Sequence, residues 1–195
     1  RVWDGSARLL LTGGQGSQDR IALPGRLHWQ LRPHWRGLQL RLNADCCTPQ
    51  DPLQLQLHMR WGGLQLQLAD SRSQWPASLL VGLGTPFNTL QPEGELELDT
   101  QDLSMQWLRG RLSLQGTARL NAHRLSSRVS SLRPMGSYRL DLSGGDTIAL
   151  QLSTLEGGLL LSGSGQWVGQ RLRFRGEARA AEGLQDQLAI LLNVL

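Results

Sequence analysis

The string Leu-Gln-Leu-Gln-Leu occurs twice in close succession, at positions 53–57 and 64–68, with Trp61, Gly62 and Gly63 between the copies. Strict apolar/polar alternation has a period of two, so every Leu lies on one face of an extended strand and every Gln on the other. A Gly-Gly pair between such segments favours a tight turn. We therefore predict an antiparallel hairpin with an uncharged polar face and an apolar face. The apolar face consists of Leu53, Leu55, Leu57, Leu64, Leu66 and Leu68.

The same alternation recurs along most of the 195 residues. Leu is not a preferred strand residue, so the period rather than the propensity carries the prediction. Short strands in close succession are typical of an antiparallel meander, sandwich or barrel. We predict one mainly β domain over residues 1–195: a single strongly curved sheet, or an incompletely closed barrel or sandwich, with a Leu-lined internal face. The expected strands are 6–11, 26–32, 37–43, 53–60, 63–69, 94–99, 103–108, 111–120, 137–143, 147–153, 158–163 and 171–178.

Two segments break the alternation and predict short helices. Residues 76–84 begin with Pro, which suits a first helical turn, and contain Gly near their end. Residues 183–194 carry Leu184, Leu188 and Leu191 at helical spacing. The second helix is expected to cap an open end of the β structure or to cover an edge strand, and alternatively to dock on a partner.

The formal net charge of +4 comes from Arg alone, because the chain has no Lys. The arginines are spread along the sequence, whereas a nucleic-acid-binding domain gathers its basic residues on one face. We therefore expect no nucleic-acid partner. Arg171, Arg173 and Arg175 alternate along one strand, which indicates a solvated face or, alternatively, a contact with phosphate or lipid headgroups. The seven tryptophans are scattered; they suit core or rim packing, and boundaries between water and apolar surface.

No group of residues predicts catalysis. A catalytic site needs convergent nucleophile, base and orienting groups, and the four histidines show no metal-ligand spacing. The Gly-rich segments 13–16 and 163–165 lack the Lys-Ser/Thr pair of a phosphate loop. We expect no enzyme activity, no metal and no cofactor. Four acidic residues share one strand face, where they are expected to be solvated and to oppose arginines such as Arg109 or Arg111; they are Glu93, Glu95, Glu97 and Asp99.

The two cysteines, Cys46 and Cys47, are adjacent. They form either a vicinal disulfide, whose small ring is strained, or two free thiols in a loop. A disulfide is expected if the compartment is oxidising. Because such a ring constrains little unfolded chain, it would stabilise the fold only slightly.

Several short motifs follow one another in the order of a known family. They are VWDGSA at 2–7, LPGRLHW at 23–29, GTPFNTLQPEG at 84–94, PMGSY at 134–138 and TLEGGL at 154–159. Together they resemble the type II secretion system protein N family. The motif positions carried over from this resemblance are Gly84, Thr85, Pro86, Pro92, Gly94, Gly136 and Tyr138.

The resemblance implies a non-enzymatic accessory component of the machine that exports folded proteins across the outer membrane of Gram-negative bacteria. The chain would be the periplasmic domain of a single-pass inner-membrane protein, with the anchor lying before Arg1. Expected partners are other secretion subunits, namely the inner-membrane platform and the secretin, with lipid or peptidoglycan as further partners. The family is also distantly similar to AsmA-like β proteins, so the alternative is a groove for lipid or another amphiphile. The deciding question is whether the Leu face is a closed core or an open groove.

Overall fold

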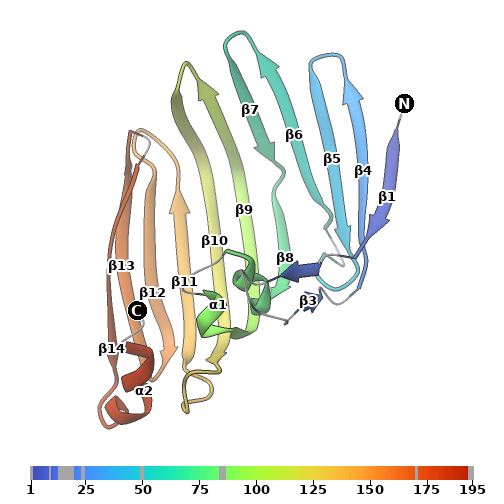
Figure 1. The fold of residues 1–195 in the computed structure, drawn as a ribbon. Coiled ribbons are helices and arrows are strands. Elements are labelled where there is room, and N and C mark those ends of the chain that lie inside the picture. The colour runs from blue at the N-terminus through green and yellow to red at the C-terminus, as the bar shows by residue number, and fades with distance from the viewer. Residues whose placement is uncertain are drawn as a thin grey trace.

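The protein forms one open antiparallel sheet of 12 strands (Figure 1). The computed structural model describes residues 2–8, 10–12, 20–22, 25–48, 51–83, 87–169 and 171–192. Most strands that follow one another in sequence are neighbours in the sheet, as in a meander. The exception is that residues 63–68 and 71–76 form strands that both pair with the strand over 92–108 and not with each other. The outer edges are β1 (Trp3–Ala7) and β14 (Arg171–Ala180). The sheet curves without closing, which confirms the predicted fold class.

The strands of the main sheet are β1 (Trp3–Ala7), β4 (Leu27–His34), β5 (Gly37–Ala44), β6 (Leu53–Arg60), β7 (Gly63–Leu68), β8 (Ser71–Pro76), β9 (Pro92–Leu108), β10 (Arg111–Ser127), β11 (Gly136–Ser143), β12 (Ala149–Gly157), β13 (Leu159–Val168) and β14 (Arg171–Ala180). A separate pair consists of β2 (Leu10–Thr12) and β3 (Arg20–Ala22). The helical segments are the 3-10 helix η1 (Ala77–Leu83), α1 (Phe87–Leu90) and α2 (Gln185–Leu192).

The strand β9 runs for 17 residues, although the sequence predicts two strands there. A β-bulge explains the difference. The register with β10 shifts at this point, and Asp102 has a φ of 48°. One extra residue reverses the parity of the alternation, so Leu98 and Leu103 both face the apolar side although their spacing is odd. Gly116 lies opposite, where an added Cβ would overlap the Asp102 carbonyl.

Other boundaries differ from the prediction for local reasons. Residues 6–11 do not form one strand, because β1 ends at Ala7 and Leu10 starts β2 in the separate pair. The strand β8 was not predicted, since it carries Ser71, Ser73 and Trp75 rather than Leu on its apolar side. The helix predicted over 76–84 is η1, the terminal helix is α2, and α1 was missed.

The helical segments pack on one end of the apolar face of the sheet. Ala77 from η1 and Leu188 from α2 are fully buried in a cluster with Leu96, Leu159 and Tyr138. Figure 1 shows η1, α1 and α2 together at the lower end of the strands, opposite the tips of the β4–β5, β6–β7 and β9–β10 hairpins. We call this the helix end of the sheet.

The polar face carries a row of alternating charges across four strands. Arg72 on β8 pairs with Asp99 on β9 at 2.9 Å, and Arg119 on β10 pairs with Asp141 on β11 at 2.7 Å. The register places Asp99 opposite both arginines. Hydrogen bonding and charge attraction from the paired carboxylates raise the pKa of both guanidinium groups. The expected opposition to Arg109 or Arg111 is therefore wrong, because Arg111 lies opposite Leu108 near the far end of β9.

Tyr138 is the one tyrosine of the chain and lies buried in the cluster at the helix end. Its hydroxyl donates a hydrogen bond to the Leu159 carbonyl at 3.0 Å, which links β11 to the start of β13. Burial raises the pKa of this phenol above its usual value of about 10. The neutral form is thus preferred in the folded state.

We predict that Tyr138 causes the loss of stability between about pH 10 and pH 11, below the pH range in which Arg titrates. Since its folded pKa is raised, its contribution is complete below about pH 10 and is lost as the pH rises further. The chain has no Lys, so lysine titration does not obscure the effect. Tyr138→Phe should cost roughly 1 kcal/mol at neutral pH, through the lost hydrogen bond, and should flatten the alkaline decline. Urea unfolding at pH 7, 9, 10 and 11 would measure both; an unchanged alkaline slope in the variant would contradict the assignment.

Candidate functional site

The six leucines of the repeated string lie in rows that cross several strands. Leu55 on β6 is opposite Leu40 on β5 and Leu68 on β7. A second row runs from Leu38 through Leu57, Leu66 and Met105 to Leu114 on β10. The third row joins Leu64, Trp107 and Leu112. Residues directly opposite in an antiparallel pair share a face, so the predicted hairpin is part of one continuous apolar surface.

This surface is covered at the helix end and uncovered toward the hairpin tips. Leu159 is 2% exposed at the helix end, beneath the helical segments. Toward the tips, Leu64 is 40% exposed, Met105 40% and Trp107 48%. The remaining leucines of the repeated string, Leu53, Leu55, Leu57, Leu66 and Leu68, are half-buried. The Leu face is therefore a closed core at one end and an open apolar surface at the other.

Phe174 covers a gap on the C-terminal part of this face. Its ring lies over Gly163, Gly165 and Gly176, where an added Cβ would approach the ring to 2.5, 2.8 and 3.0 Å respectively. Gly163 and Gly165 belong to one of the Gly-rich segments. Their absence of side chains makes room for an aromatic ring from the edge strand, a known device for filling glycine positions in sheets.

The described positions of the family motifs gather at the helix end. Pro92 and Gly94 begin β9, and Gly136 and Tyr138 begin β11. Gly94 has a φ of 138°, and an added Cβ there would meet the His123 carbonyl at 2.8 Å. These positions shape the covered part of the apolar face. Gly84, Thr85 and Pro86 lie outside the described residues.

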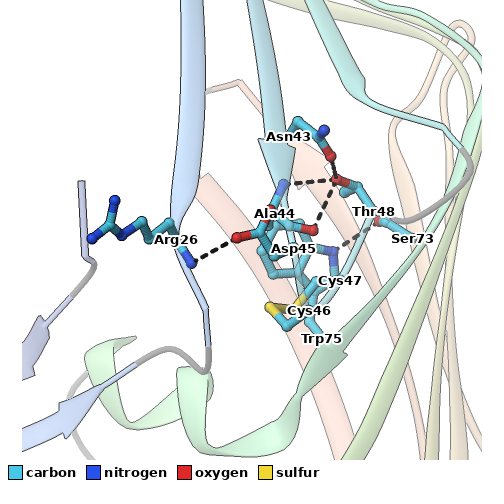
Figure 2. Close-up of a disulfide and its surroundings, with 9 residues drawn as sticks. All are labelled: Arg26, Asn43, Ala44, Asp45, Cys46, Cys47, Thr48, Ser73 and Trp75. Carbon is cyan, nitrogen blue, oxygen red and sulfur yellow. Dashed lines mark hydrogen bonds between the residues drawn. A yellow bond between two sulfur atoms is a disulfide. The ribbon is translucent and has the colours of Figure 1, made fainter. Parts of the chain in front are cut away.

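Cys46 and Cys47 form a disulfide in the turn after β5 (Figure 2). Cys47 is buried, and its carbonyl accepts a hydrogen bond from the Gln74 N–H of β8 at 2.8 Å. The hydroxyl of Thr48 accepts from the Ala44 N–H at 2.8 Å, and the Asp45 carboxylate accepts from the Arg26 N–H at 3.3 Å. The pair thus lies in a hydrogen-bonded turn that fixes β5 against β8 and β4.

Around the disulfide, apolar side chains from three segments form a second small cluster. Cys47 and Ala44 pack with Leu27 of β4, Trp75 of β8 and Leu79 of η1. The Trp75 indole N–H donates to the Ser73 hydroxyl at 2.8 Å. The sequence offered no sign of these neighbours, because Trp75 and Cys47 are far apart along the chain.

Several ionisable side chains in the described part of the chain form isolated exposed pairs. Among the described residues, no group of three or more His, Cys, Asp or Glu is placed to hold a metal ion. Glu93 approaches Arg128 at 3.5 Å and Arg133 at 3.8 Å, and His28 approaches Asp45 at 3.5 Å. These are exposed pairs of the kind that contribute little to stability.

Comparison with protein families identifies the chain over almost its full length. The family model described as "Type II secretion system (T2SS), protein N" matches residues 2–195. Neither the curated proteins nor the solved structures returned a match. Over the residues that the structure describes, no helix has the length and apolar character that a membrane crossing requires.

We predict that the two halves of the apolar face differ sharply in their contribution to stability. Leu159→Ala should cost about 2–5 kcal/mol, because it leaves a cavity in the covered cluster. Leu64→Ala, the matched control in the uncovered half, should cost less than about 1 kcal/mol because its side chain already contacts water. Urea denaturation of both variants gives the comparison. Equal losses would mean that the uncovered half is packed in solution.

Proposed function

Because the chain belongs to the type II secretion system protein N family, we propose that it is an interaction module of the secretion apparatus. It acts as the periplasmic part of an inner-membrane protein and contacts the inner-membrane platform and the secretin. It performs no catalysis. Its role is to hold other subunits in place while folded proteins are exported.

The open sheet edge at β14 is the observation that carries this proposal. β14 pairs with β13 along all ten residues, and the sheet ends there. Seven consecutive residues of β14, from Arg171 to Glu177, are exposed. An edge strand presents unpaired N–H and C=O groups, and β-strand addition is a common way for one chain to bind another.

Capture experiments would test the proposal directly. The immobilised chain should retain at least one separately expressed periplasmic region of another secretion component. Failure to retain any of them would count against the interaction role.

A pair of proline variants tests whether the β14 edge makes the contact. Successive N–H groups of a strand point to opposite sides, so one of Leu172→Pro and Arg173→Pro removes an outward donor, and the other breaks a bond to β13. The variant with the higher melting temperature identifies the outward donor. We expect this variant to lose capture several-fold. Undiminished capture by it would exclude the β14 edge.

The uncovered half of the apolar face supports a second candidate function, binding of a lipid or another amphiphile. Leu64, Met105 and Trp107 form a contiguous exposed patch, and exposed apolar patches commonly mark binding sites. The observation that distinguishes this role from a subunit interface is a small molecule that stays bound to the chain during purification.

Native mass spectrometry of the chain purified from bacterial cells would detect such a ligand. We expect added mass in the lipid range that decreases in Met105→Gln, which makes the patch polar at similar length, and not in Phe174→Leu at the distant edge strand. A protein that carries no added mass under gentle ionisation would remove this second candidate.

A further inference from the structure

Tryptophan and arginine meet at the tips of three neighbouring hairpins, at the end of the sheet opposite the helices. Trp35 and Arg36 form the β4–β5 turn, and Trp61 follows Arg60 in the β6–β7 turn. Trp35 is 76% exposed, Trp61 is fully exposed, and Met59 beside it is 73% exposed. Figure 1 shows these tips at the upper end of the sheet, away from η1, α1 and α2.

Backbone hydrogen bonds join the three tips into one structure. The Met59 N–H donates to the Arg36 carbonyl at 3.0 Å, and the Arg109 N–H donates to the Gly62 carbonyl at 3.4 Å. The tips of β4–β5 and β6–β7 together line a hollow of about 1190 Å³. We call the joined tips the hairpin rim, consisting of Trp35, Arg36, Arg60, Trp61, Trp107 and Arg109.

The segments on either side of the three tips carry only positive charge, whereas the part of β9 farther from its tip holds Glu93, Glu95, Glu97, Asp99 and Asp102. Residues 30–44, 52–69 and 103–118 contain no Asp or Glu, and they hold six arginines: Arg32, Arg36, Arg41, Arg60, Arg109 and Arg111. Since the whole chain has a net charge of +4, the rest of it is net negative. Six of the 20 arginines therefore lie in a part of the sheet that contains no acidic residue.

Within the described part of the chain, these arginines have no carboxylate partner. The ion pairs there involve Arg72, Arg119, Arg128, Arg133 and Arg179, together with His28. The Arg36 guanidinium lies 4.0 Å from the centre of the Trp35 ring, an exposed cation–π contact. The positive charge of the hairpin rim is therefore available to an anionic partner.

We propose that the hairpin rim binds the surface of a bilayer that contains anionic phospholipids. Trp35 and Trp61 insert at the depth of the headgroups, where indole rings are preferred, and the neighbouring arginines pair with lipid phosphates. Next to Trp107 of the hairpin rim, the uncovered apolar residues Leu64 and Met105 extend the apolar surface along the sheet. Exposed Trp, unpaired Arg and adjoining apolar surface fit a lipid interface better than a nucleic acid, for which apolar Met and Leu offer little.

Vesicle binding of the purified chain tests the proposal. The probes are vesicles of phosphatidylcholine alone and vesicles with about one third phosphatidylglycerol, in about 0.05 M and about 0.5 M NaCl. We expect sedimentation with the anionic vesicles, a blue shift of tryptophan fluorescence on binding, and weaker binding at the higher salt concentration. Failure to bind the anionic vesicles at low salt would overturn the proposal.

Two double variants separate the contributions of charge and of tryptophan. Arg36→Gln with Arg60→Gln should weaken binding roughly 30-fold, because each basic residue contributes about tenfold or less near an anionic surface. Trp35→Ser with Trp61→Ser should weaken binding several-fold and remove most of the blue shift. All four positions lie in exposed hairpin tips, so melting temperatures should change little.

The matched control is Arg26→Gln with Arg128→Gln, which removes the same charge from exposed positions at the helix end of the sheet. It should retain nearly all vesicle binding. Equal loss in the control would overturn the proposal, as would equally tight binding of a single-stranded DNA oligonucleotide that depends on the same residues. Capture of secretion components in lipid-free buffer does not involve the hairpin rim, so this test and the test of the proposed function can fail separately.

Discussion

The packing of three short helical segments against one end of a single sheet is the interaction on which this structure depends. A lone sheet has no opposing layer, so its apolar face must be covered by something else. Ala77 of η1 and Leu188 of α2 provide that cover and are fully buried. Without them, Leu96, Leu159 and Tyr138 would lose the contacts that exclude water. The described helical residues extend over only part of the sheet, which leaves apolar surface near the hairpin tips in contact with solvent.

Keeping the two faces distinct over seventeen-residue strands requires corrections to the alternation. Asp102 on β9 and Arg124 on β10 both have positive φ angles near register shifts, and each adds one residue to its strand. After each bulge the apolar residues return to the same face. The opposite face then carries the row from Arg72 to Asp141, which suits water but not a core. The two bulges and the row of charges therefore keep one face of the sheet apolar and the other polar.

The sequence predicted the features that follow from a local pattern, and it did not predict those that depend on contacts between residues far apart in the chain. The period of two identified the Leu rows and most strands, because strand orientation follows directly from alternation. The alternation predicted two strands in place of β9, because the extra residue at Asp102 exchanges the two faces of the strand and no local sequence feature indicates this bulge. It missed β8, whose inward side carries Ser71 and Ser73, and it assigned the wrong arginines to Asp99, since pairing across strands depends on register. The family resemblance was confirmed by the match over residues 2–195.

The meeting of Trp and Arg at the hairpin rim also depends on residues that are far apart in the chain. Arg36, Arg60 and Arg109 are separated by many residues in the chain, and their even spread suggests a bias of composition rather than a surface. A meander of antiparallel hairpins brings every second turn to the same end of the sheet, so widely spaced turn residues become neighbours. The other turns lie at the helix end, where Asp45 and Glu93 are found. The topology thus gives the molecule two chemically different ends. The closed end holds the sheet together, and the open end presents tryptophan, arginine and apolar surface to a partner outside the chain.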